Sequence, residues 1–128
     1  MDAESYDPRY VEGIQEFNRR DFFEAHEVWE DLWLDCEDSS RRFYQGLIQV
    51  AVCLHHFGNG NTRGARKLYH SSSGYLQKYG PKHLGLDIEK LLAQMRQCCA
   101  GILEGYDAPS VKIDPELIPE IHLTPASG

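Results

Sequence analysis

Two stretches decide the fold of this chain: FFEAHEVWEDLW at residues 22–33 and FYQGLIQVAVCLHHFGNGNTRGA at residues 43–65. Each places apolar residues three and four positions apart, the spacing that puts side chains on one face of an α-helix. The second stretch is apolar almost all round up to Phe57, which is typical of a buried helix. We therefore predict two central helices, over residues 22–34 and from about residue 40 to residue 57.

Both predicted helices carry polar residues on a face that should be apolar. In the first helix, His26, Glu27 and Glu30 are threaded between aromatic residues. The second helix has a stripe about three turns long, made of Arg42, Gln45, Gln49 and His56. Because a buried polar side chain without a partner costs about 1–3 kcal/mol, we expect the two stripes to face each other in a closed, hydrogen-bonded layer.

Three further helices are predicted over about residues 6–17, 62–79 and 87–104, where apolar residues again recur at helical spacing. Asp21, Asn61 and Asp87 stand just before predicted helices and are residue types that cap helix N-termini. Glu24 follows Asp21 by three positions, as in a capping box. Residues 83–86 are expected to form a loop, and no segment shows a convincing strand pattern.

The end of the chain has a different composition. Prolines interrupt it at positions 109, 115, 119 and 125, so it cannot be helical throughout. Its apolar residues predict a segment that lies extended along the helices as far as Ile121. The fold prediction is therefore all-α: a compact bundle of about five helices at residues 1–107, and a Pro-rich C-terminal tail at residues 108–128 that packs on the bundle in part.

Charge and composition limit the partners that the chain is expected to have. The net charge of −7 over 128 residues argues against nucleic acid or an anionic membrane as the main partner. No apolar run approaches the roughly 18 residues of a membrane span, and the N-terminal residues do not resemble a secretion signal. Four cysteines without a C-x-x-C pair predict reduced thiols in a cytoplasmic protein.

Several separated blocks match a known family in order and spacing. They are FEAHE at residues 23–27, Glu30 and Trp33, QGLIQ at 45–49, His56, GN at 60–61 and RGA at 63–65. In these blocks the chain resembles the domain-of-unknown-function 309 family, over about residues 14–80. The resemblance implies a small all-helical bundle, often a dimer, with no assigned biochemical activity. Trp29 departs from the family pattern, which has an aliphatic residue before its tryptophan, so bulkier local packing is expected.

Three interpretations of the polar stripes stay open: a closed layer, a metal site, and a small-molecule or acid–base site. The metal site would use His26, Glu30 and His56, three ligands from two helices. A Glu–His pair could act as an acid–base couple, but no nucleophile is clearly set beside it. Glutamines are poor zinc ligands and good partners for Glu and His, which favours the layer. The candidates for polar-layer or ligand-binding residues are Glu24, His26, Glu27, Glu30, Trp33, Arg42, Gln45, Gln49, His56, Asn61 and Arg63.

From these observations we expect a non-catalytic cytosolic binding or assembly module that forms a homo-dimer, needs no cofactor and has an unknown ligand. The alternative is a metal-dependent or acid–base, hydrolase-like enzyme. It would use His26, Glu27, Glu30 and His56.

Overall fold

Five α-helices form the framework of the computed structural model, which describes residues 6–103 and 111–125. Their bounds are α1 Pro8–Asn18, α2 Phe22–Asp35, α3 Arg41–Gly58, α4 Thr62–Leu76 and α5 Ile88–Cys99. Short 3₁₀ turns are η2 Gln77–Tyr79 after α4, η3 Ala100–Ile102 after α5 and η4 Pro115–Leu117 near the end of the chain. The predicted all-α fold is confirmed. No helix of the described residues is long and apolar enough to cross a membrane.

The helices α1 and α2 pack closely because a small residue meets a large one. A side chain at Gly13 would collide with the indole of Trp29. The indole is fully buried, and its Nε1 donates to the backbone oxygen of Tyr10 at 3.2 Å. Burial of apolar surface stabilises a fold by about 25 cal/mol per Å². An aromatic side chain as large as Trp therefore contributes several kcal/mol when it is buried. Trp29, the departure from the family pattern, is therefore a core residue.

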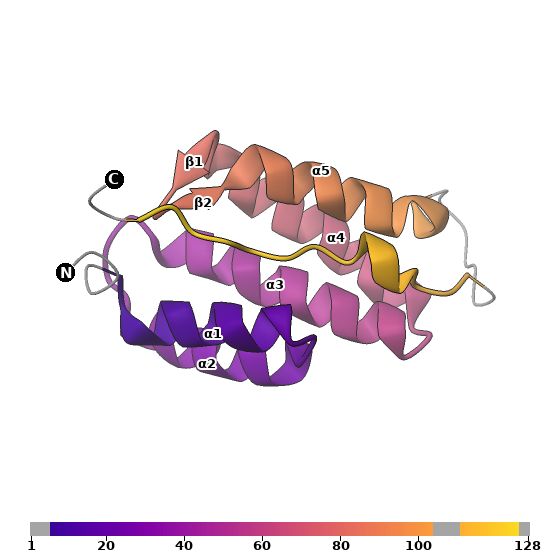
Figure 1. The fold of residues 1–128 in the computed structure, drawn as a ribbon, viewed down its shortest axis with the longest axis horizontal. Coiled ribbons are helices and arrows are strands. Elements are labelled where there is room, and N and C mark those ends of the chain that lie inside the picture. Colours follow the sequence, from indigo (N-terminus) through magenta and orange to yellow (C-terminus); the bar gives the residue numbers. More distant parts are fainter. Residues whose placement is uncertain (1–5, 104–110, 126–128) are drawn as a thin grey trace.

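The helix α3 occupies the middle of the bundle, with α1 and α2 on one side and α4 and α5 on the other (Figure 1). Its inward side chains include Phe43, Leu47 and Leu54, each at most 1% exposed. Gly46 lets α4 come close, because a Cβ there would lie 2.8 Å from the side chain of Leu76. The next helix begins at a side-chain cap, where the Asn61 Oδ1 accepts from the backbone N–H of Gly64 at 3.0 Å.

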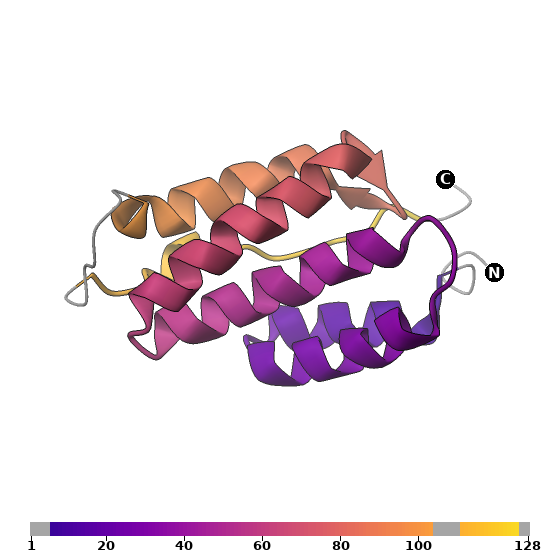
Figure 2. The same cartoon turned by 180° about the vertical axis from the view of Figure 1, so that it is seen from behind.

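The end of the chain, residues 111–125, runs as an extended strap over α3 between α1 and α5 (Figure 1). Its buried anchor is Ile121, and further apolar residues of the strap pack against the core. Seen from behind, α3 lies between α2 and α4, and no described segment crosses it on that side (Figure 2). Residues 111–125 therefore pack on the helices, whereas the predicted boundary at residues 107 and 108 lies outside the described residues.

A small hairpin replaces the loop expected at residues 83–86. The strand β1, Lys82–His83, pairs antiparallel with β2, Leu86–Asp87. The two turn residues, Leu84 and Gly85, both have positive φ, at 48° and 76°, as in the two-residue turns that fit the twist of a hairpin. The prediction that the chain has no strands was wrong here, because two-residue strands are too short to show an alternating pattern.

Two α-helices begin without a side-chain cap, and at one of them, α2, a cap was predicted. Asp21 precedes α2 but its side chain makes no capping hydrogen bond, so no capping box with Glu24 forms. Ser40 precedes α3 without a side-chain cap, and its backbone N–H instead donates to the Oδ1 of Asp38 at 2.8 Å. The helix α5 ends at Cys99 and turns into η3, several residues before the predicted end.

Candidate functional site

The polar residues of α2 lie on its outward side. Its buried residues are Phe22, Ala25, Trp29 and Leu32. These positions repeat at intervals of three and four and therefore form the inward face. Glu24, Glu27 and Glu30 are exposed and His26 is half-buried. The expected closed layer was wrong for α2, because Ala25 and Trp29, and not the polar stripe, occupy the side that meets the core.

The stripe of α3 lies at the edge of the core. Arg42 is exposed, whereas Gln45, Gln49 and His56 are half-buried. In the described part of the chain no hydrogen bond joins either glutamine to a glutamate or histidine of α2, and the Oε1 of Gln49 is buried without a partner. No hydrogen bond of the described residues therefore joins the two stripes, which contradicts the hydrogen-bonded layer.

The histidines make local contacts. His26 donates through Nδ1 to the backbone oxygen of Phe23 at 2.9 Å. The Nδ1 of His56 lies 3.3 Å from the side-chain Nδ2 of Asn61. The ring of His55 lies beside that of Phe23, with centroids 5.6 Å apart. Within residues 6–103 and 111–125, no group of three or more His, Cys, Asp or Glu side chains is placed to hold a metal ion. The suggested ligand set of His26, Glu30 and His56 is therefore not assembled.

Other predicted site residues have roles that the geometry explains without a ligand. Asn61 caps α4 and supports His56. The indole of Trp33 is half-buried, with the guanidinium of Arg41 4.1 Å from the ring centroid, a cation–π contact. Its Nε1 is buried without a partner in the described structure. Arg63 is exposed on the first turn of α4.

An exposed face therefore emerges on α2, and we call it the α2 outer face. It consists of Phe23, Glu27, Glu30 and Leu34, which follow one another at intervals of four, three and four on one side of the helix. Phe23 is 46% exposed and Leu34 is 63% exposed, and among the described residues these are the exposed large hydrophobic side chains. Two exposed apolar side chains thus flank two exposed carboxylates on this face.

A serine–histidine pair that sequence analysis missed joins the start of α3 to the strand β1. The Ser40 Oγ and the His83 Nε2 are hydrogen-bonded at 2.9 Å. The imidazole of His83 packs against the rings of Phe43 and Tyr79, with centroids 4.7 Å apart in both cases. Burial lowers the pKa of His83, and the negative charge of Asp38 opposes this shift in part. Ser40 itself is only 9% exposed, so the pair ties the hairpin to α3.

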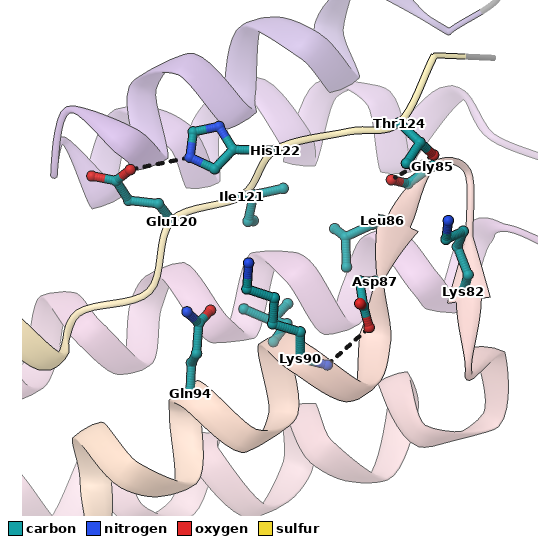
Figure 3. A pocket seen from close by; sticks show the side chains of 11 residues that line it. Lys82, Gly85, Leu86, Asp87, Lys90, Gln94, Glu120, Ile121, His122 and Thr124 are labelled. Carbon is teal, nitrogen blue, oxygen red and sulfur yellow. Dashed lines mark hydrogen bonds and ion pairs between the residues drawn. The ribbon is translucent and has the colours of Figure 1, made fainter. Parts of the chain in front are cut away.

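A cavity of about 170 Å³ lies between the hairpin, α5 and the strap (Figure 3). Two of its polar groups already have partners: Asp87 caps α5 at the backbone N–H of Lys90, and Glu120 pairs with His122 at 3.1 Å. The Oε1 of Gln94 is buried without a partner in the described structure. No sequence motif marks this cavity, because its walls come from segments about thirty residues apart.

The four cysteines are free thiols. Cys53 is fully buried and its Sγ donates to the backbone oxygen of Ala65 at 3.2 Å. The Sγ atoms of Cys53 and Cys99 are 4.0 Å apart. The pKa of the Cys99 thiol is raised, first by its hydrogen bond with Cys53 and also by burial. A thiol that stays protonated is a poor nucleophile, so the fully buried Cys99 acts as a core residue.

The chain is similar in sequence to uncharacterized proteins and to a family of unknown function. The uncharacterized protein YpuF of Bacillus subtilis is 38% identical over 95 residues, which cover 71% of this chain and 55% of that protein. An uncharacterized protein of Aquifex aeolicus is 41% identical over 46 residues, 35% of this chain and 14% of that protein. The chain thus spans about half the length of the Bacillus relative and a smaller share of the Aquifex relative. The model of the family described as domain of unknown function (DUF309) matches residues 10–68, from α1 into α4, and over these residues the chain is similar to that family.

Proposed function

We propose that this chain is a non-catalytic binding or assembly module of the cytoplasm, and that the α2 outer face is its docking surface. The observation that carries this proposal is the exposure of Phe23 and Leu34 on one side of a helix whose opposite side is fully packed. A few side chains near the centre of an interface carry most of its binding energy. The whole face lies inside the segment matched by the family model.

Two further observations support this function. The histidines that an enzyme would use make local hydrogen bonds. His26 bonds to the backbone of its own helix, and His56 bonds to Asn61. Four free cysteines are typical of a reducing compartment, which supports the cytoplasmic assignment. The homo-dimer expected from the family resemblance belongs to the same proposal.

The test is site-specific photocrosslinking in cells that produce the protein. A photoreactive phenylalanine analogue is placed at position 23 or 34 in the α2 outer face, and at the exposed position Gln97 of α5 as a matched control. We expect covalent adducts with a second protein molecule, of this chain or of another, at positions 23 and 34 and not at 97. Equal yields at all three positions would contradict a docking role for this face.

A further inference from the structure

The charges of α2 are all of one sign. The helix carries five carboxylates and no lysine or arginine; the carboxylates are Glu24, Glu27, Glu30, Asp31 and Asp35, and all are exposed. Asp35 is paired with Arg9 at 2.7 Å. The other four have no ion-pair partner within residues 6–103 and 111–125. Negative charge from Glu24 to Asp31 is therefore left without an ion-pair partner among the described residues.

The apolar side chains bracket this charge. Phe23 stands one turn before Glu27, and Leu34 stands one turn after Glu30, so the two anchors are about 16 Å apart at 1.5 Å per residue. Phe23 is supported from below by His26 and His55, whose ring centroids lie 5.0 and 5.6 Å away. The aromatic anchor is thus held in place while 46% of it stays exposed.

We propose that the α2 outer face docks a basic amphipathic helix of another protein, an inference that rests on the binding function proposed above. Two helices pack side by side when the ridges of one fill the grooves of the other. The apolar stripe of such a partner would cover Phe23 and Leu34. Lysines or arginines beside that stripe would meet Glu27 and Glu30, and opposite charges across an interface favour association and fix its register.

The same charges argue against other occupants of this face. If two copies packed α2 against α2 with two-fold symmetry and Phe23 beside Leu34, Glu27 of each copy would meet Glu30 of the other. Four carboxylates would then face one another, and like charges in contact disfavour association. Nucleic acid and anionic membranes are disfavoured for the same reason. The dimer expected for this chain is therefore assigned to another surface.

The experiment titrates the full chain into a fluorescently labelled peptide about as long as α2, with leucine at i, i+3, i+4 and i+7 and lysine elsewhere. Fluorescence anisotropy reports binding, and the same peptide with glutamate in place of lysine is the negative control. We expect the lysine peptide to bind, the glutamate peptide not to bind, and added salt to weaken the interaction.

Variants then separate this face from the general negative charge of the protein. The double variant Glu27→Lys/Glu30→Lys should weaken peptide binding by about tenfold or more, and Phe23→Ala/Leu34→Ala should weaken it to a similar degree. The matched control Glu89→Lys/Glu116→Lys changes net charge by the same amount on exposed residues of α5 and η4, and should leave binding nearly unchanged. Circular dichroism checks that each variant is folded.

Two results would overturn the inference: no binding of the lysine peptide, or equal weakening by the two charge-reversal pairs. These failures differ from a failure of the proposed function. If photocrosslinks form at positions 23 and 34 while the lysine peptide does not bind, the docking function stands and the basic helix is the wrong partner. If neither forms, both are wrong.

Discussion

The two sides of α3 differ in how their polar groups are partnered. On the side of the strap, Asn18 exchanges two hydrogen bonds of 2.9 Å with the backbone of Ile121, and Thr124 bonds through its N–H to the oxygen of Gly85 at 2.9 Å. On the side of α2, the Nε1 of Trp33 is buried without a partner in the described structure.

Exposure of apolar groups follows the same division. The strap buries Ile121 to 4% exposure, whereas the α2 outer face leaves Phe23 and Leu34 in solvent. Paired polar groups and buried apolar side chains stabilise the fold, while apolar side chains that stay exposed are available to contact another molecule. The strap side therefore serves stability, with Gln94 beside its cavity as an exception, and association is the role that we propose for the α2 side.

The largest effect is expected on the closed side, for Asn18→Ala. This change removes the amide that bonds both the N–H and the oxygen of Ile121. A buried group that loses its partner costs about 1–3 kcal/mol, so the free energy of unfolding should fall clearly in urea denaturation. The control is Asn59→Ala, which removes an exposed amide bonded to His55 and should change little. Similar losses for both would show that the strap is not fixed by Asn18.

A gain in stability is expected for Gln49→Leu. The substitution removes a buried oxygen that has no hydrogen-bond partner in the described structure and keeps a side chain of similar size. The free energy of unfolding should therefore rise by about 1 kcal/mol. The measurement is the midpoint of chemical denaturation, and Gln45→Leu on the same stripe serves as the control. A loss of stability at position 49 would mean that this glutamine has a partner after all, as the closed layer required.

A smaller, pH-dependent effect is expected for His83→Gln. Burial holds the pKa of His83 below its ordinary value of about 6.5, so the unfolded chain takes up a proton more readily than the folded one. Its contribution to stability is therefore present above the unfolded pKa and is lost as the pH falls through the folded pKa. His83→Gln should flatten the fall in unfolding free energy below about pH 6.5, whereas His70→Gln, at an exposed position, should not. Parallel pH profiles for all three proteins would contradict a buried neutral imidazole.

The smallest effect is expected for Phe23→Ala/Leu34→Ala. Because both side chains are exposed, the free energy of unfolding should stay within about 0.5 kcal/mol of the unmodified chain. Leu54→Ala, at 1% exposure, is the control and should cost about 2–5 kcal/mol. Comparable losses in the two variants would place Phe23 and Leu34 in the core and remove the distinction between the two sides.

The helices were predictable because their signals are local. Apolar spacing located all five, and Asn61 and Asp87 cap their helices as their residue types indicate. The family blocks mix two kinds of residue: Gly46, Asn61 and Gly64 are explained by close packing and capping, whereas Phe23 and Glu27 point outward.

What could not be predicted depends on contacts between distant residues. Asn18 meets Ile121 across 103 positions and Ser40 meets His83 across 43, and no periodicity reports such pairs. The direction of the polar stripe was missed because Ala25 and Trp29 compete with it for the inward side of α2. Periodicity shows that a helix has two faces, and packing against α1 and α3 decides which one is buried.

The most direct test of the difference between the two sides is a heteronuclear NMR titration of the isotope-labelled chain with the lysine–leucine peptide. We expect the largest changes in backbone amide chemical shift within α2 and on the adjoining outward side of α3, with the strap and α5 nearly unchanged. The largest changes in residues 111–125 or in α5, or shifts spread evenly over the chain, would contradict the assignment of the α2 outer face as the docking surface.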